Sequence, residues 1–222
     1  MRAFNEIYDI AAARKGGAAA LEAMVAQHQS KSPDALKAIP ESRWLAEMSK
    51  FVFRTGLNWS VIENKWPGFE DAFHGFDVGK CAMMDDAWFD SLLTDTRIIR
   101  HGAKIASVRD NAALFLELRE QGGIGAVVAD WPDADYSGLL DMLKTRGSRL
   151  GGSTGAYALR FMGRPGYILS NDVVARLIAE GVIDKNPTSK TAMKQVQAAF
   201  NIWQDESGRS LTEISRVLAL SV

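Results

Sequence analysis

The strongest constraint on the fold is a helical spacing of apolar residues that recurs along most of the 222-residue chain. In residues 43–53, apolar side chains at 44, 45, 48, 51 and 52 share one face of a helix. Only 125–129 and 166–170 have the composition of strands, and two isolated short runs do not make a sheet. The sequence therefore predicts an all-α fold of about ten helices. The expected helices span 17–29, 43–53, 67–76, 85–94, 103–120, 135–146, 153–162, 171–180, 189–205 and 210–220.

Composition excludes several classes of protein. With 47% hydrophobic residues and a net charge of −1, the chain can bury a sizeable core and is not a disordered tail. A single cysteine, Cys81, excludes a disulfide framework and a cysteine-rich zinc module, and we expect neither metal nor cofactor. No apolar run approaches the roughly 18–20 residues of a membrane span, and the acidic amino terminus does not resemble a signal peptide. We expect one domain over 1–222, no membrane partner and a cytoplasmic location.

The near-zero net charge conceals an uneven distribution. No acidic residue occurs in 142–171, which carries five basic residues, or in 96–109, which carries four. These windows together carry +9, so the remaining 178 residues carry −10. A basic face on an acidic body is typical of a protein that binds a phosphate backbone. The alternative is that these residues are ordinary solvated helix faces.

A glycine-rich turn lies within the longer basic window. Residues 150–156 (LGGSTGA) stand between two helical patterns, so the chain makes a tight turn and starts a helix that we expect Ser153 or Thr154 to cap. Such a turn presents backbone N–H groups to a phosphate at the positive end of a helix, although similar turns are common in purely structural roles. The residues expected to contact DNA are Gly152, Ser153, Thr154, Gly155, Arg146, Arg149, Arg100 and Lys104.

Four stretches carry a recognisable order of motifs. TGLNWSVIENKWPGFEDAFHGFD (55–77) precedes LLTDTRIIRHGAKIASVRDNA (92–112), and KTRGSRLGGSTGAYALRFMG (144–163) precedes SNDVV (170–174). In order and spacing they resemble the DNA-3-methyladenine glycosylase I family of the helix-hairpin-helix glycosylase superfamily. The resemblance covers about residues 41–175, and 1–40 and 183–222 are expected to form additional helices. It implies two helical lobes with a pocket between them.

The resemblance also implies an activity. Enzymes of this family flip an alkylated adenine out of double-stranded DNA and hydrolyse its N-glycosidic bond. The expected wedge that fills the gap in the duplex is Leu57, which follows the flexible Gly56. A flipped base needs aromatic side chains around it. The expected pocket residues are Trp59, Phe51, Phe53 and Trp44, although core packing is the better reading for the last two.

Asp172 matches the acidic position that follows the hairpin in the superfamily. A carboxylate there would stabilise the cationic sugar or orient water. Asn171 and Asp172 are also good helix caps, so catalysis and capping remain alternatives for this residue. Superfamily members that cleave the strand carry a lysine where this chain has Ala156, so a monofunctional hydrolase without lyase activity is expected.

The sequence departs from the family at several positions. Zinc-containing members hold their termini with two cysteines and two histidines, but Val173 and Leu177 stand where the carboxy-terminal pair would be, so the longer ends are expected to replace the metal. The amino-terminal tyrosine-histidine-aspartate motif is also missing. Phe51 occupies the position at which members of the family carry the glutamate that hydrogen-bonds to the damaged base. Glu47, one helical turn earlier, is the candidate substitute for that glutamate.

Three functions are therefore open. The first is a metal-independent monofunctional glycosylase for alkylated purines such as 3-methyladenine, acting as a monomer. The second is a catalytically inactive helix-hairpin-helix protein that binds DNA, and the third is a helical scaffold whose basic face binds a protein. Release of alkylated base separates the first two, and salt-dependent DNA binding separates both from the third.

Overall fold

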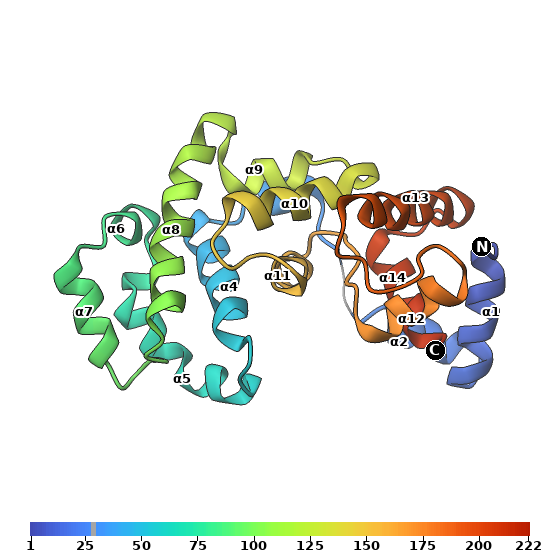
Figure 1. Cartoon of the computed structure of the whole chain (residues 1–222), viewed down its shortest axis with the longest axis horizontal. Coiled ribbons are helices and arrows are strands. Elements are labelled where there is room, and N and C mark those ends of the chain that lie inside the picture. The colour runs from blue at the N-terminus through green and yellow to red at the C-terminus, as the bar shows by residue number, and fades with distance from the viewer. Residues whose placement is uncertain (28–29) are drawn as a thin grey trace. The chain divides into compact units, whose positions relative to one another are not determined.

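The computed structural model describes residues 1–27 and 30–222, and over that part of the chain its regular elements are all helices, which confirms the predicted all-α class (Figure 1). Within the described residues, three short 3₁₀ helices (His74–Phe76, Arg119–Gln121 and Asp133–Asp135) accompany the α-helices. The α-helices are α1 (Phe4–Lys15), α2 (Ala18–Val25), α3 (Pro33–Lys37), α4 (Glu41–Arg54), α5 (Trp59–Ala72), α6 (Val78–Ala82), α7 (Asp86–Thr94), α8 (Gly102–Leu118), α9 (Gly123–Asp130), α10 (Tyr136–Arg146), α11 (Ser153–Met162), α12 (Asn171–Ala179), α13 (Lys190–Ser207) and α14 (Leu211–Leu220).

The helices form two compact units. Unit 1 comprises three segments, Met1–Lys31, Trp131–Leu139 and Gly163–Val222. Unit 2 comprises two, Ser32–Asp130 and Leu140–Met162. Each unit buries its own aromatic core, so each has a hydrophobic interior of its own.

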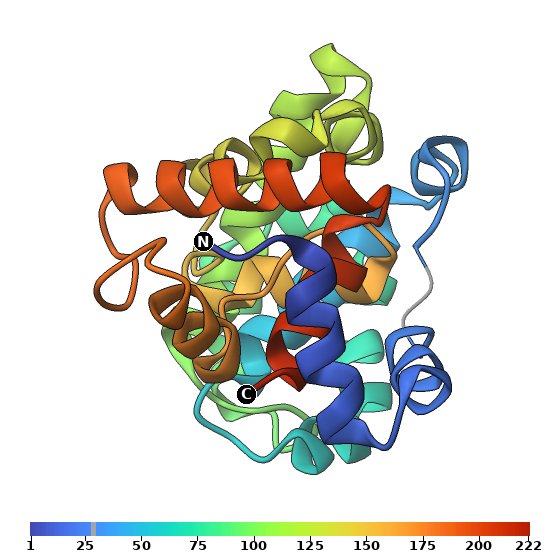
Figure 2. The same cartoon turned by 90° about the vertical axis from the view of Figure 1, so that its right-hand side faces the viewer.

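Unit 1 contains both the amino-terminal and the carboxy-terminal segments of the chain. Helix α1 packs against α14, α2 and α13, as Figure 2 shows for the blue α1 and the red α14. The core contains stacked rings of Tyr167 and Phe200, whose centroids are 4.3 Å apart. Helix α14 also packs against α12, where Val173 and Leu177 are buried. Val173 and Leu177, the two positions at which the resemblance would place zinc ligands, are therefore covered by α14.

Helix α4 is central to unit 2, where it packs against α5, α8, α9 and α11. Its inner face meets the phenylalanine-rich segment, and the ring centroids of Phe53 and Phe69 lie 4.5 Å apart. Phe73 and Phe76 continue this core with a stacked contact at 5.3 Å. The phenylalanine-rich motif of the sequence thus forms part of the hydrophobic core of unit 2.

The structure differs from the predicted elements in several places. Pro67 was expected to open a helix, but α5 already begins at Trp59 because Asn58 accepts a hydrogen bond from the Ser60 amide at 3.0 Å. Pro67 lies inside α5 and is exposed, and as a proline it donates no N–H to the hydrogen bonds of the helix. Residues 125–129 belong to α9, and α1, α3 and α6 were not predicted. The predicted helix 17–29 corresponds to α2, and positions 28–29 lie outside the described residues.

Across 1–27 and 30–222, none of the helices combines the length and the hydropathy needed to cross a bilayer. The same residues contain no group of three or more histidine, cysteine, aspartate or glutamate side chains placed to hold a metal ion.

Candidate functional site

The glycine-rich turn joins α10 to α11 as a tight helical hairpin. Its backbone is held by the buried side chain of Asn111, which accepts a hydrogen bond from the Ser148 amide at 2.8 Å and donates one to the Ser148 carbonyl at 3.0 Å. Gly155 is buried, and a Cβ atom there would lie 2.6 Å from the Leu150 carbonyl oxygen. Gly155 therefore serves to close the hairpin rather than to face a ligand.

The exposed part of the turn is Gly152 and Ser153. Gly152 has a φ of +61°, and no atom lies within 4 Å of where its Cβ would be. Helix α11 begins at Ser153, so Ser153 and Thr154 lie in its first turn, and capping by either side chain stays a prediction. The Thr154 amide donates to the Gly151 carbonyl at 3.3 Å. Gly152 and Ser153 are therefore the turn residues best placed to meet a phosphate.

All three arginines predicted to contact DNA lie on unit 2, and two of them, Arg146 and Arg149, lie just before the glycine-rich turn in the sequence. Arg146 forms an ion pair with Glu117 at 3.1 Å, and Arg149 donates from Nε to the Ala103 carbonyl at 3.1 Å. Arg100 is exposed just before α8. Arg149 thus ties the turn to α8, and the role of the three arginines in DNA contact stays a prediction.

Lys104 has a different role from the predicted DNA contact. Its side chain is buried, and Nζ donates to the carbonyl oxygens of Phe53 at 3.1 Å and Thr55 at 2.7 Å. Burial, together with the positive charge of Arg149, lowers the pKa of the Lys104 ammonium below its usual value. The ammonium therefore caps the carboxyl end of α4 instead of facing a phosphate.

Replacing Lys104 by methionine should separate these two roles. The variant should lose about 1–3 kcal/mol of unfolding free energy, because two carbonyl oxygens lose their buried donor. Its DNA affinity should keep the wild-type salt dependence. The matched variant Arg100→Met should instead keep its stability and reduce the salt slope by about one. Thermal unfolding and DNA titrations at several salt concentrations measure both. A reduced salt slope in the Lys104 variant without a loss of stability would contradict the capping role.

The predicted wedge is exposed in the loop between α4 and α5. Gly56 has a φ of +74°, which lets the chain turn sharply after α4. Leu57 follows with 39% of its surface exposed, and Trp59 is the first residue of α5 with 42% exposed. An apolar side chain at an exposed turn is available for insertion between base pairs.

Trp59 belongs to an aromatic cluster on unit 2, which consists of Phe51 on α4, Trp59 on α5, and Tyr157 and Phe161 on α11. The Phe51 ring is stacked with Tyr157 at 5.9 Å and meets Trp59 edge-on at 5.6 Å. Phe161 lies 5.0 Å from Phe51 and 6.2 Å from Trp59. The predicted pocket residues Phe51 and Trp59 are thus brought together by α11, the second helix of the hairpin.

The guanidinium of Arg54 is held within this aromatic cluster. Its central carbon lies 4.5 Å from the ring centroids of both Phe51 and Trp59, and 5.7 Å from that of Phe161. Glu63 pairs with Arg54 and, at 2.8 Å, with Lys50. Burial opposes ionisation of the Glu63 carboxyl, but hydrogen bonds from Lys50 and Arg54 outweigh it and lower its pKa. The cluster is therefore built to stack a planar cation.

Two predicted pocket residues lie elsewhere. Trp44 and Phe53 are fully buried in the core of unit 2. They share the apolar face of α4 that turns toward the other helices, so no base can reach them. This corrects their assignment to a pocket and agrees with the core packing that was their alternative.

Asp172 is exposed in the first turn of α12. The cap of that helix is Ser170, whose hydroxyl oxygen accepts a hydrogen bond from the Val173 amide at 3.3 Å. Capping by Asp172 or Asn171 is therefore wrong, and a catalytic role for Asp172 stays a prediction. Glu47 is half-buried on α4, one turn before Phe51, and its role also stays a prediction.

The sequence reasoning missed four residues of this region: Arg54, Tyr157, Phe161 and Asn111. Tyr157 and Phe161 are four residues apart directly after the glycine turn, so a shared helix face was readable. Arg54 lies three residues after Phe51, on the same side of the helix, so a contact between its guanidinium and the Phe51 ring was readable from the spacing. No local signal shows that Asn111 reaches Ser148, because that contact spans 37 residues.

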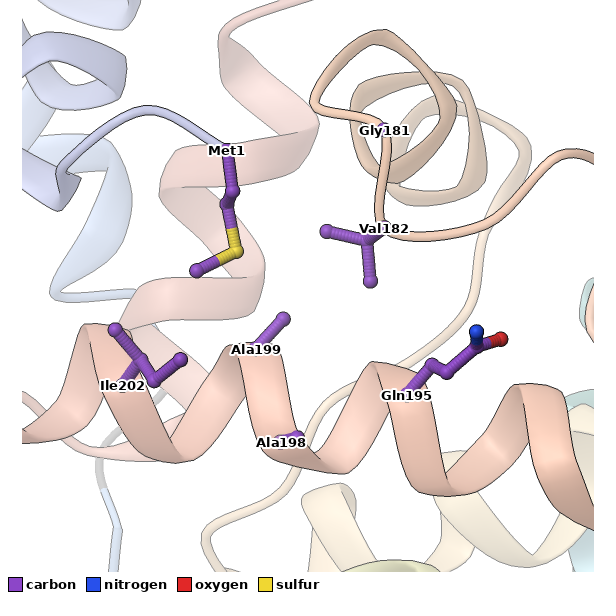
Figure 3. Close-up of a pocket in the computed structure, with 7 residues that line it drawn as sticks. All are labelled: Met1, Gly181, Val182, Gln195, Ala198, Ala199 and Ile202. Carbon is purple, nitrogen blue, oxygen red and sulfur yellow. The ribbon is translucent and has the colours of Figure 1, made fainter.

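A shallow hollow on unit 1 offers no comparable chemistry. Figure 3 shows Ala199 and Ile202 of α13 facing Met1 and Val182 across it. No side chain that titrates near neutral pH lines it. It is therefore not a catalytic candidate.

Comparisons with known proteins point to one family. Residues 45–136 match the family model of methyladenine glycosylases. Over 69 residues the chain is 33% identical to DNA-3-methyladenine glycosylase 1 of Escherichia coli and 32% identical to DNA-3-methyladenine glycosylase of Haemophilus influenzae. These matches cover 31% of this chain and 37% of each relative, so they span little more than a third of the relatives' length.

Solved structures share the fold. The 3-methyladenine DNA glycosylase I of Staphylococcus aureus matches with a TM-score of 0.52 at 19% identity, over 63% of this chain and 82% of that one. A single-residue variant of such an enzyme, in complex with 3-methyladenine, matches with the same score and identity over 62% and 82%. At this identity the likeness establishes the fold alone. Through residues 45–136 the chain is therefore similar to the methyladenine glycosylases, the family that its motifs resemble.

Proposed function

We propose that this protein is a DNA N-glycosylase that removes alkylated purines from double-stranded DNA by hydrolysing the N-glycosidic bond. These alkylated purines include 3-methyladenine, the base in the names of the two similar proteins from Escherichia coli and Haemophilus influenzae. In this proposal the hairpin at Gly152 and Ser153 holds the phosphate backbone, and Leu57 enters the duplex where the base leaves it. The two units act together as one glycosylase-like domain.

The observation that carries this proposal is the aromatic cluster around Arg54. Its rings already stack a planar cation at 4.5 Å. An alkylated purine in DNA is also planar and cationic, and such a base stacks on aromatic faces. The cluster lies on the same unit as the hairpin and the exposed Leu57. The presence of the hairpin, the exposed Leu57 and the aromatic cluster on one unit supports the proposal.

The proposed chemistry needs few groups. A cationic purine is a good leaving group, and the developing charge on the sugar calls for a carboxylate, for which Asp172 is the candidate. Ala156 is buried within α11, and a Schiff-base lyase would need an amine at that position. We therefore propose a monofunctional hydrolase without metal or cofactor, active as a monomer inside the cell near its DNA.

Release of free base from duplex DNA treated with dimethyl sulfate tests the proposal. We expect wild-type protein to release methylated purines, detected by chromatography, and borohydride to trap no protein–DNA adduct. Leu57→Ala should slow release more than it weakens binding to undamaged duplex, because the wedge acts only when a base is extruded. A protein that binds duplex DNA but releases no methylated base would rule out the enzyme.

That last result would favour the second candidate, a catalytically inactive DNA-binding protein. A specific observation supports it: Arg54 already occupies the aromatic cluster that a base would use. In this alternative the hairpin and Leu57 retain their DNA contacts, and the cluster is only part of the hydrophobic core.

A further inference from the structure

The exposed Leu57 lies between two fixed points of the backbone. On one side, α4 is followed by Thr55, whose carbonyl oxygen accepts a hydrogen bond from Lys104 Nζ at 2.7 Å. On the other side, the side chain of Asn58 caps α5. Only Gly56 and Leu57 lie between these two points in the sequence. The position of Leu57 therefore depends on what holds Thr55 and Asn58.

Lys104 holds the end of α4 through two carbonyl oxygens. The last carbonyls of a helix have no partner within the helix and need donors from elsewhere. Lys104 Nζ donates to the carbonyl oxygens of Phe53 at 3.1 Å and Thr55 at 2.7 Å. The Arg54 carbonyl between them accepts from the Leu57 amide at 3.1 Å. The buried ammonium thus fixes the same turn of backbone to which the Leu57 amide is bonded.

The same helix that carries Lys104 also holds the hairpin turn. Ala103, the residue before it, accepts a hydrogen bond from Arg149 Nε at 3.1 Å. Two turns further along α8, the Asn111 side chain bonds to both the amide and the carbonyl of Ser148. The hairpin and the loop between α4 and α5 are therefore both tied to α8, within unit 2.

We infer that Lys104 is a positioning residue for the wedge, because it holds Leu57 at a fixed place relative to the hairpin. This inference rests on the proposed function and adds a residue to its mechanism. A wedge has to enter the duplex at one defined base step while the backbone is held, and a displacement of about 1 Å can cost about 100-fold in rate. Gly56 gives the loop conformational freedom, and the hydrogen bonds of Lys104 limit it.

A double-mutant cycle separates positioning from general stabilisation. Lys104→Met should slow single-turnover release of methylated purines about tenfold, while its affinity for undamaged duplex DNA stays near that of the wild type. In the Leu57→Ala background the same substitution should have little further effect on release, because Lys104 acts on the reaction through Leu57. No effect in the wild-type background, or equal effects in both backgrounds, overturns the inference.

Thr212→Val is the matched control for lost stability. The Thr212 hydroxyl is buried on unit 1, where it accepts from the Gly166 amide at 3.0 Å and donates to the Gly166 carbonyl at 3.2 Å. This variant also loses two buried hydrogen bonds, so it should lose stability but keep the wild-type rate of release. Unfolding curves give the folded fraction of each variant at the assay temperature. A control that slows release as much as Lys104→Met overturns the inference.

A single glycine inserted after Gly56 tests the same link without changing Lys104. The insertion lies in an exposed turn, where one extra residue costs little stability, and Phe53 and Thr55 can keep their bonds to the ammonium. Because the insertion separates Leu57 from this fixed point, it should slow release about as much as Lys104→Met. An insertion variant that keeps the wild-type rate overturns the inference, even if Lys104→Met does not fold.

Binding to duplex DNA that contains one tetrahydrofuran abasic residue separates the inference from the proposed function. This probe offers a gap to the wedge and needs no catalysis, so wild type should bind it more tightly than intact duplex. Leu57→Ala, Lys104→Met and the insertion should each reduce that preference. If this result is obtained without any release of methylated bases, the glycosylase is overturned and the positioning role stands. Release by wild type and Lys104→Met at equal rates keeps the glycosylase and overturns the positioning role. A wild type that shows neither release nor preference overturns both.

Discussion

Replacing Asp172 by asparagine is expected to lower the rate of base release from methylated DNA by about 100-fold or more. Departure of a purine leaves positive charge on the sugar, which a carboxylate stabilises and a neutral amide does not. The helix should be unaffected, because Ser170 caps α12 and Asp172 is exposed in its first turn. Single-turnover release assays measure the rate, and circular dichroism checks the fold.

The matched control is Ser170→Ala. It removes the hydroxyl that accepts from the Val173 amide and should cost about 1 kcal/mol of stability, while base release stays near the wild-type rate. The two variants thus separate capping from chemistry within three residues of one helix. Release by the Asp172 variant at more than a third of the wild-type rate would remove Asp172 from the mechanism.

Replacing Gly152 by valine is expected to weaken DNA binding by about tenfold or more. Gly152 is exposed with a φ of +61°, and the added side chain would project from the turn at which we expect a phosphate to lie close to the backbone. The left-handed backbone is also unfavourable for a β-branched residue. Titration of labelled duplex DNA at fixed salt concentration measures the loss.

Gly208→Val controls for the backbone strain. Gly208 ends α13 with a φ of +67° and, like Gly152, has no atom within 4 Å of its Cβ position. Both variants should lose similar stability, but only the hairpin variant should lose DNA affinity. Equal affinities for DNA in the two variants would refute the hairpin as the contact.

Most of the helices were predictable because they leave a local pattern, whereas α1, α3 and α6 were missed and part of α9 resembled a strand. The apolar spacing of 43–53 follows from one buried face of α4, and the glycine turn at 150–156 marks the hairpin. The exposure of Leu57 was also predictable, since Gly56 predicts a turn and turns lie at the surface. These features depend on neighbours within a few residues.

The assembled site was less predictable because it depends on packing between distant segments. Arg54 is close in sequence to Phe51, but Phe161 reaches it only through the packing of α11 on α4. Lys104 lies in a basic window, but its ammonium is buried because it donates hydrogen bonds to the carbonyl oxygens of Phe53 and Thr55, about fifty residues earlier. Net charge in a window cannot distinguish a lysine that faces solvent from one that caps a buried helix.

The pairing of α1 with α14 sets an order of folding during synthesis. Unit 2 is complete once residue 162 is available, whereas unit 1 needs residues up to Val222. Contacts between segments that are distant in sequence form late, because a long loop must close first. A nascent chain that stalls before α14 would carry a folded unit 2 and an α1 whose apolar side chains, such as Phe4 and Ile7, have no core to enter. Such a chain would be a substrate for chaperones and proteases.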